Sequence, residues 1–372
     1  MAVINRVVKN SCVGCGACAN ACPSDNIFMQ SSREGFLYPN KKEKCSECGI
    51  CEKSCPILNP LSISENQYEP QVYAAWSLDE EIRFNSTSGG VFTELAKAVI
   101  YQDGCVVGAK YNENHLVEHD IVENIKDISL LRQSKYIQSE TKDVFRRIEK
   151  KLQNDKVVLF VGTPCQCAGL ICNLQKSYEN LILCDFICRG VNSPMVFLKY
   201  LAELQKEFRS SVKQVWFKNK QYGWNNFSTK IIFEDGQEYL RGRDTDLFMH
   251  GYIKNGLNLY MRPSCGECRF KGIKRPVDIT MGDFWGVKLT ESDDNTENGV
   301  SVVIVHTETG LSLIKSISHR IYIEEHNIND VLYLNRCLTT TIEASDKSDA
   351  FYNILRNESF SRAIQSVIDT SK

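Results

Sequence analysis

The residues with the clearest chemical meaning are two runs of cysteines near the start of the chain. Within each run, two residues separate the first three cysteines, three residues precede the fourth, and a proline follows it. The two runs are Cys12, Cys15, Cys18 and Cys22, and Cys45, Cys48, Cys51 and Cys55. This spacing is typical of 4Fe-4S cubanes, in which three thiolates of a run hold one cluster and the fourth thiolate reaches the other. The sequence therefore predicts two clusters, one held by Cys12, Cys15, Cys18 and Cys55, and one held by Cys45, Cys48, Cys51 and Cys22.

Paired zinc sites and a disulfide knot are the alternatives for these eight thiols. Zinc sites usually pair two C-x2-C units and require neither a third such step nor a final Cys-Pro. A disulfide knot needs an oxidising compartment, and residues 1–10 lack the apolar run of a signal peptide. The segment resembles a bacterial two-cluster ferredoxin, which implies an α+β ferredoxin-like iron–sulfur domain over 1–62. A polar stretch at 63–71 is the predicted linker.

Composition limits the classes of function. The 372 residues suffice for two or three domains, and 42% of them are hydrophobic, so a sizeable core is expected. The net charge of −2 offers no basic field for nucleic acid. No window approaches eighteen consecutive apolar residues, so we expect no transmembrane segment. The 17 cysteines favour a reducing compartment, and we expect a cytoplasmic protein.

Beyond the linker, apolar runs and helical patterns alternate, which predicts a larger α/β domain with a mixed sheet. The predicted strands include 72–76, 104–109, 157–161, 181–186, 277–281 and 300–305, with a shorter β-rich part over 212–240. The predicted helices are 91–100, 141–152, 164–170, 194–208, 244–254 and 309–318. We divide this part into 72–155, 156–340 and a C-terminal helix within 341–372, expected over 350–368.

Four further cysteines stand at the ends of predicted elements. They are Cys165, Cys188, Cys265 and Cys268. Cys165 begins a predicted helix, where the helix dipole favours a thiolate. The four thiols could hold a third cluster or a zinc ion, and the C-x2-C pair alone is equally typical of a redox dithiol. The other cysteines, which have no partner at ligand spacing, are assigned to packing: Cys105, Cys167, Cys172, Cys184 and Cys337.

The turn before the helix at 91–100 is a candidate anion site. Ser88, Gly89 and Gly90 leave free backbone N–H groups at the start of the helix, and such groups bind phosphates. An ordinary Ser-capped helix is the alternative.

Six short motifs, taken in order, resemble a known family over about 72–340. They are 86–91 (Ser-Thr-Ser-Gly-Gly-Val), 134–136 (Ser-Lys-Tyr), 162–166 (Gly-Thr-Pro-Cys-Gln), 188–190 (Cys-Arg-Gly), 265–268 (Cys-Gly-Glu-Cys) and 278–283 (Asp-Ile-Thr-Met-Gly-Asp). The family is that of the coenzyme F420 hydrogenase and dehydrogenase beta subunits. The resemblance implies an FAD-binding domain and a third 4Fe-4S cluster on Cys165, Cys188, Cys265 and Cys268. The residues that it places at FAD are Ser88, Gly89, Gly90, Ser134, Lys135, Tyr136, Ser139, Thr163 and Gln166.

An electron relay is the function that this resemblance implies. A flavin accepts two electrons as a hydride and passes them on singly to clusters. Lys135 is the expected catalytic residue, because a cation near the flavin stabilises its anionic reduced form; a solvated loop lysine is the alternative. The sequence locates no pocket for coenzyme F420, which archaeal members of the family use, so another hydride donor or acceptor stays open.

Three hypotheses remain for the role in the cell. The chain is an oxidoreductase with its own substrate, a non-catalytic electron-transfer subunit of a larger complex, or an accessory reductase of a surface-polysaccharide or cofactor pathway. A basic loop surrounds the C-x2-C pair and consists of Arg262, Arg269, Lys271, Lys274 and Arg275. It could dock an acidic redox protein such as a ferredoxin, offset the charge of a cluster, or be merely solvated.

Overall fold

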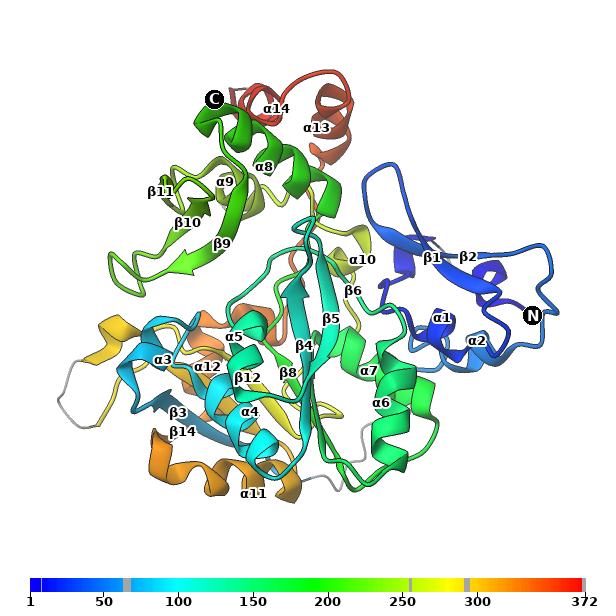
Figure 1. The fold of residues 1–372 in the computed structure, drawn as a ribbon, viewed down its shortest axis with the longest axis vertical. Coiled ribbons are helices and arrows are strands. Elements are labelled where there is room, and N and C mark those ends of the chain that lie inside the picture. The colour runs from blue at the N-terminus through cyan, green and yellow to red at the C-terminus, as the bar shows by residue number, and fades with distance from the viewer. Residues whose placement is uncertain (8, 63–67, 254–255, 291–294, 370–372) are drawn as a thin grey trace.

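The computed structural model describes residues 1–7, 9–62, 68–253, 256–290 and 295–369. A small N-terminal domain lies beside a larger α/β domain, which itself carries a second, smaller sheet (Figure 1). Most of the linker expected at 63–71 falls outside the described residues. Among the described residues, no helix is both long and apolar enough to cross a membrane.

The N-terminal domain is a pseudo-repeat around its cysteines. Each cysteine run contains a short helix that begins after a glycine in the left-handed region, Gly16 (φ 76°) or Gly49 (φ 81°). One antiparallel hairpin covers the two runs. The elements are the 3-10 helices Val3–Asn5 and Lys9–Ser11, helices α1 (Ala17–Ala21) and α2 (Ile50–Lys53), and strands β1 (Ile27–Ser31) and β2 (Leu37–Lys41).

The larger domain is built on a nine-stranded mixed sheet with the order β14-β3-β13-β12-β8-β7-β4-β5-β6. Its centre, β4, β7, β8 and β12, is parallel, and antiparallel strands flank the centre on both sides. The strands are β3 (Gln71–Ser77), β4 (Cys105–Tyr111), β5 (Val117–Val122), β6 (Ser139–Glu140), β7 (Val158–Gly162), β8 (Leu181–Phe186), β12 (Ile279–Asp283), β13 (Ser301–Val305) and β14 (Ile321–His326).

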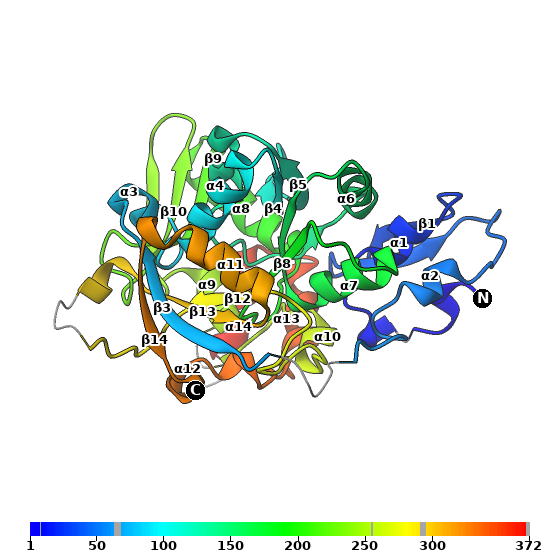
Figure 2. The same ribbon diagram turned by 90° about the horizontal axis from the view of Figure 1, so that it is seen from below.

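Helices cover both faces of the sheet because its central strands are apolar on both sides. Along β7, Leu159 joins the core on one face, whereas Val158 and Phe160 join the core on the other. One face carries α4 (Val91–Tyr101), α5 (Ile128–Leu131) and α11 (Glu308–Ser316), and the other carries α6 (Val144–Gln153) and α7 (Pro164–Leu174). Two short helices lie near the β3 and β14 edge, α3 (Glu80–Phe84) and α12 (Ile328–Leu334). Figure 2 shows α6 and α7 between the sheet and the N-terminal domain.

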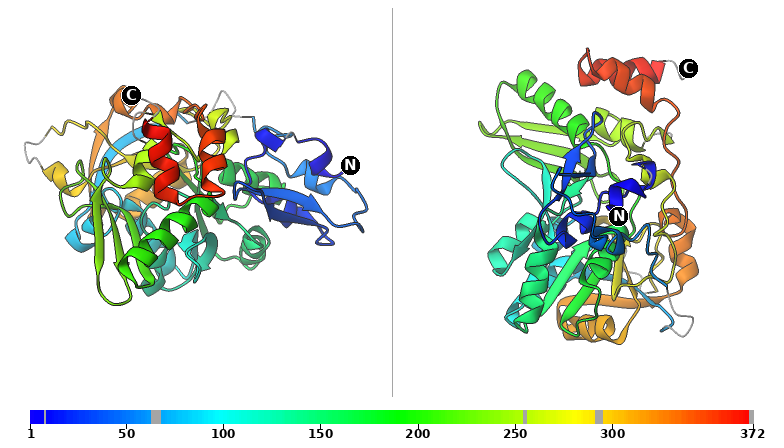
Figure 3. Two further views of the ribbon diagram at one scale, coloured as in Figure 1. Left: turned by 90° about the horizontal axis from the view of Figure 1, so that it is seen from above. Right: turned by 90° about the vertical axis from the view of Figure 1, so that its right-hand side faces the viewer.

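A third layer has its own aromatic core, to which Phe197, Phe217 and Phe248 contribute. It combines the sheet β9 (Val212–Asn219), β10 (Ser228–Phe233) and β11 (Glu238–Gly242) with α8 (Pro194–Phe208), α9 (Leu247–Ile253), α13 (Ser348–Leu355) and α14 (Phe360–Asp369). Helix α10 (Pro263–Gly266) leads from this layer back to the main sheet. The two C-terminal helices lie beside α8, red against green in Figure 3.

The predicted α/β domain with a mixed sheet is confirmed, and α8 and β8 have the predicted bounds. The single C-terminal helix expected over 350–368 is wrong, because the structure has two helices, α13 and α14. The break lets Phe351 and Phe360, on different helices, enter the same aromatic core. Strands β5 and β14 were not predicted, since their alternating residues carry little apolar signal.

The N-terminal domain docks through buried polar groups at the start of α6. The amide of Asn20 donates to the carbonyl oxygens of Lys142 (2.7 Å) and Gly16 (3.0 Å), and its oxygen accepts from the backbone N–H of Phe145 (3.2 Å). A Cβ at Gly16 would lie 2.0 Å from the hydroxyl of Thr141, so the two domains touch closely here. These hydrogen bonds and this close approach therefore fix how the N-terminal domain sits on the start of α6.

Replacing Asn20 tests this interface. Asn20→Ala removes the partner of the buried N–H of Phe145 and the bond to the carbonyl of Lys142, and an unpaired buried group costs about 1–3 kcal/mol. We expect the thermal midpoint of the anaerobic protein to fall by several degrees, as measured by circular dichroism. The exposed Asn114→Ala is the matched control and should leave the midpoint unchanged. Equal midpoints for the two variants would show that the interface adds no stability.

Candidate iron–sulfur and flavin sites

The structure gathers the eight N-terminal cysteines into the two predicted sets. We call Cys12, Cys15, Cys18 and Cys55 the medial set, and Cys22, Cys45, Cys48 and Cys51 the distal set. Burial, then Cys18, Cys12 and Cys55, raises the pKa of Cys15 well above its ordinary value, so the medial thiols are close neighbours. Thiols crowded and buried in this way stay protonated unless a bound cation compensates the charge of their thiolates, which fits a metal cluster.

The distal set lines a hollow of about 270 Å³ at the surface of the domain. All four distal thiols border it, and Cys48 is the exposed one. Backbone amides already point at two of these sulfurs, from Asn26 to Cys22 (3.2 Å) and from Val3 to Cys51 (3.3 Å). Although burial opposes it, hydrogen bonds from the backbone of Ser24, Asn26 and Ile27 lower the pKa of Cys22. Such N–H to sulfur bonds stabilise cluster thiolates.

Four cysteines of the larger domain also converge, and we call them the proximal set: Cys165, Cys188, Cys265 and Cys268. Cys165 lies in the first turn of α7, Cys188 follows β8, and the C-x2-C pair begins in α10. Burial and then Cys265 and Cys165 raise the pKa of Cys188, and Cys268 contributes as well. Three separate chain segments thus bring four thiols to the carboxyl end of the parallel strands, where ligands bind in α/β sheets.

Cys165 differs from the expectation that its place in the helix would make it a thiolate. Burial and the neighbouring Cys268 raise its pKa, although the hydroxyl of Thr163, 3.1 Å from its sulfur, opposes them. Desolvation therefore outweighs the helix dipole at this thiol.

No three His, Cys, Asp or Glu side chains among the described residues are placed to hold a single metal ion. In a cubane each thiolate binds a different iron atom, so its four sulfurs surround a larger volume. Four thiols in each of the three sets match the donor number and type of a 4Fe-4S cluster.

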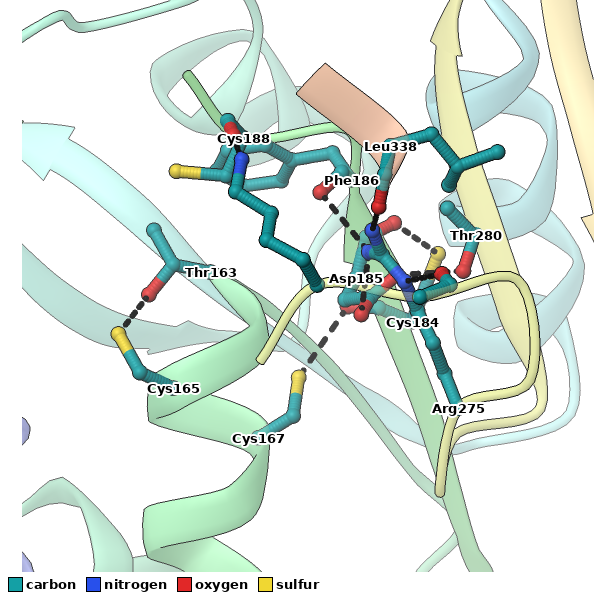
Figure 4. Close-up of polar contacts among 12 residues, drawn as sticks. Thr163, Cys165, Cys167, Cys184, Asp185, Phe186, Cys188, Arg275, Thr280 and Leu338 are labelled. Atoms are coloured by element: carbon teal, nitrogen blue, oxygen red, sulfur yellow. Dashed lines mark hydrogen bonds and ion pairs between the residues drawn. The ribbon is translucent and has the colours of Figure 1, made fainter. Parts of the chain in front are cut away.

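Buried polar groups support the strand end that carries Cys188 (Figure 4). The guanidinium of Arg275 pairs with Asp185 (2.9 Å), and the hydroxyl of Thr280 donates to the other carboxylate oxygen (2.6 Å). Lys271 donates to the carbonyl oxygens of Cys188 and Cys337. Two members of the basic loop therefore have structural partners and fix the Cys188 segment.

The proximal and medial sets are neighbours across the domain interface. A Cβ at Gly169 on α7 would lie 2.9 Å from the sulfur of Cys15, and Cys15 is among the thiols that raise the pKa of Cys165. Cys18, in turn, has Cys51 of the distal set among its neighbours. The three sets therefore follow one another in the order proximal, medial, distal.

Two of the segments predicted at FAD lie side by side. The backbone N–H of Ser134 donates to the hydroxyl of Thr87 (2.8 Å), which joins the loop at 132–136 to the turn at 85–90. Within that turn, Ser88 donates to the carbonyl of Val300 (2.7 Å), and the N–H of Gly89 donates to Ser301 (2.9 Å). These two groups are thus already engaged with β13 and its approach.

Glycine at 89 and 90 has a packing reason. A Cβ at Gly89 would lie 2.4 Å from the carbonyl oxygen of Ala75 on β3, and Gly90 has a φ of 88° at the start of α4. The sheet therefore demands both glycines before any ligand is considered.

Lys135 is a partly buried cation without a carboxylate partner among the described residues. Its ammonium donates to the carbonyls of Arg132 (2.7 Å) and Gln133 (3.3 Å) and lies 5.6 Å from the ring centre of Tyr111. Burial lowers its pKa to about 7. The side chain of Tyr136 does not join these contacts and packs on Phe217 and Tyr252 of the aromatic core.

The other three predicted residues meet at a histidine that sequence reasoning missed. The side chains of Thr163 and Gln166 form the capping box of α7. His119 on β5 lies 2.7 Å from the hydroxyl of Ser139 and 3.5 Å from the amide of Gln166. Burial lowers the pKa of His119 to about 4, so it is neutral at pH 7. A lone histidine in an alternating strand gave no signal in the sequence.

Three buried polar atoms near these segments have no hydrogen-bond partner: the hydroxyl of Tyr111, Nε1 of Trp216 and Nε of Arg189. Tyr111 adjoins Lys135, and Arg189 lies over the ring of Tyr252 (5.6 Å), which packs on Tyr136. Trp216 meets the ring of Phe84, just before the turn at 85–90. Unpaired buried donors are costly, so these atoms fit a site that a polar ligand completes.

Comparison with known proteins gives two family matches. Residues 155–331 match the family described as the C terminus of the coenzyme F420 hydrogenase/dehydrogenase beta subunit, and residues 11–58 match the 4Fe-4S dicluster domain. A solved chain of the F420-reducing NiFe hydrogenase complex from Methanosarcina barkeri is 14% identical, with a TM-score of 0.47, covering 83% of this chain and 95% of that one. No curated protein sequence matches.

Removing one proximal thiol tests the ligand assignment. Cys265→Ala should lose one cluster's worth of iron and sulfide and leave the two N-terminal clusters in place, because no other thiol of that set can replace it. Iron and sulfide analysis after anaerobic purification measures the loss. Cys337→Ala, a cysteine assigned to packing, is the control. Full iron content in Cys265→Ala would exclude Cys265 as a ligand.

Proposed function

Because the chain belongs to the coenzyme F420 hydrogenase/dehydrogenase beta subunit family and carries a 4Fe-4S dicluster domain, we propose that it is an iron–sulfur flavoprotein oxidoreductase with FAD and three clusters. As an iron–sulfur protein it serves electron transfer. The flavin, the third cluster and the hydride carrier are the parts that we add.

The position of the proximal set carries this proposal. Cys165 lies two residues after Thr163, in the turn that also holds Gln166. Cys188 precedes Arg189, which lies over the ring of Tyr252, and Tyr252 packs on Tyr136. On its other side, the proximal set meets Cys15 of the medial set. The four thiols therefore stand between the predicted flavin residues and the dicluster domain, which is where a connecting cluster is needed.

Because the ligand sets follow one another in the order proximal, medial, distal, the proposed relay has a proximal end and a distal end. All four proximal thiols are partly buried, whereas the distal set opens to solvent at Cys48. A redox protein could reach the distal set, and a small hydride carrier would act at the flavin. The direction of flow depends on the potentials of these two partners.

FAD, when bound, supplies the exchange between hydride and single electrons. This chain contributes the surroundings. Lys135 can place a positive charge beside a reduced, anionic ring, Arg189 offers an unpaired Nε, and Tyr136 contributes a partly buried aromatic ring. The loop at 132–136 is held to the turn at 85–90, so both segments would contact one ligand.

Anaerobic purification with iron, sulfide and flavin analysis tests the proposal. We expect three clusters and one FAD per chain. Two clusters without flavin would reject the assignment of the larger domain and leave a dicluster ferredoxin joined to an unidentified module.

A donor test separates an enzyme with its own substrate from an electron-transfer subunit. Reduced coenzyme F420, NADH and NADPH are each mixed with the protein, and flavin bleaching is followed. Bleaching by one of them supports an enzyme. Reduction by dithionite alone supports a subunit that needs its partner.

The pH dependence of FAD binding tests the role of Lys135. Its pKa of about 7 lies below the ordinary value, so the free protein loses this charge as the pH rises through 7. Because the flavin dinucleotide is anionic, binding favours the protonated lysine, and affinity should fall by about tenfold between pH 6 and pH 9. Lys135→Met should bind FAD more weakly at pH 6 and lose that part of the pH dependence. Fluorescence titration measures both, and an unchanged profile in the variant would remove Lys135 from the site.

A further inference from the structure

Arg262 lies between the medial and proximal sets and is completely buried, with 0% of its surface exposed. Its Nε donates to the carbonyl oxygen of Cys12 (2.9 Å), and its Nη2 donates to that of Leu37 (3.0 Å). Its Nη1 donates to Oε1 of Gln138 (3.1 Å). Its own carbonyl accepts the N–H of Cys265 (3.0 Å). One residue thus touches the backbone of a ligand from each of the two sets.

The charge of Arg262 is not compensated by a carboxylate. Its partners are neutral oxygens, including the hydroxyl of Ser264 (3.2 Å), and its guanidinium stacks over the ring of Tyr38 (4.3 Å). No ion pair of Arg262 occurs within the described ranges. A guanidinium stays protonated in proteins, and burying it unpaired is costly. Such a charge is retained where neighbouring negative charge repays the cost.

Arg262 is also joined directly to the proximal set, because it is the N-cap residue of α10, the helix that contains Cys265. Both flanking sets consist of four thiols, and thiolate-bound clusters become more negative when reduced.

We propose that Arg262 is a positioning residue that also places a fixed positive charge between the proximal and medial clusters and thereby favours their reduced states. This inference rests on the proposed function, because it requires a cluster on each set. The guanidinium orients the Cys12 loop through its hydrogen bonds and stabilises the added electron on either side. Distal Cys48 lies on the far, exposed side of the N-terminal domain and should sense the charge least.

Arg146 provides a matched control. It also joins the domains and donates to the carbonyl oxygens of Ala19 (3.0 Å) and Cys22 (2.6 Å). However, Arg146 pairs with Asp25 (2.5 Å), and its side chain is 35% exposed. Its charge is therefore compensated and screened, whereas its hydrogen bonds to the interface resemble those of Arg262.

Gln138→Glu is the decisive variant. The new carboxylate would accept the hydrogen bonds that Oε1 of Gln138 now accepts from Nη1 and from the N–H of Leu37, and it would neutralise Arg262. The contacts of Arg262 to Cys12 and Leu37 remain, and the one bond given up is the long donation from the Gln138 amide to the carbonyl of Gly14 (3.4 Å). In a dithionite titration of the loaded protein, followed by electron paramagnetic resonance, we expect the proximal and medial reduction equilibria to shift at least tenfold toward oxidised. Tenfold corresponds to about 59 mV for one electron. Arg262→Gln should shift them in the same direction, and Arg262→Lys should restore most of the wild-type value.

The outcomes separate the two levels of the proposal. Wild-type protein without three cluster signals contradicts the proposed function itself. If all three signals are present but their midpoints are unchanged in Gln138→Glu, the charge role of Arg262 is overturned. It is also overturned if the distal cluster shifts as much as the other two, or if Arg146→Gln shifts the midpoints as much as Gln138→Glu. Loss of iron from Gln138→Glu as well as from Arg262→Gln also overturns it, because the residue would then serve folding alone.

Discussion

The packing of α1 against α6 and α7 is the contact on which the rest of the molecule depends. The N-terminal domain has few apolar residues of its own apart from its cysteines, and it satisfies its polar groups by borrowing from the larger domain. Asn20 caps the start of α6, and the hydroxyl of Thr141 donates to the carbonyl of Cys15 (3.0 Å). These contacts fix the medial set against the helix that carries Cys165.

A close approach of two helices requires that nothing project between them. Gly169 on α7 and Gly16 before α1 leave that space, and a side chain at either position would collide with the other domain. Gly89 is required for the same steric reason, because β3 passes too near for a Cβ at this position. Small residues in this chain therefore mark where separate segments must meet, whether or not a ligand lies there.

Cysteine spacing predicted much of the N-terminal domain because a cubane imposes local distances on the chain. Cys188 and Cys265 had no such signal, since 76 intervening residues include an entire sheet layer, and only the finished fold brings them together. Parallel strands such as β7 and β8 were readable as continuous apolar runs. His119 was not identified as a site residue because its importance arises from neighbours far along the chain, such as Ser139. Arg262 was identified only as a member of the basic loop, and its contact with Cys12 could not be predicted because 249 residues separate the two.

The serine and glycine residues at 88–90 have the composition of a phosphate-binding turn, and their contact with FAD stays a prediction. The structure adds that Ser88 and Gly89 have partners in β13 and its approach. Lys220 adds a further anchor by donating to the carbonyl of Ser88 (2.7 Å). The turn at 85–90 is therefore held in place by the protein itself.

The open hollow at Cys48 also decides where the molecule is vulnerable. Dioxygen dissolved in the surrounding water would meet a cluster in the distal set first, since the medial thiols Cys15, Cys18 and Cys55 are buried. Damage there would disconnect the inner centres from any outside acceptor while leaving them intact. The inner centres would then remain able to hold electrons but could no longer pass them to an acceptor outside the protein.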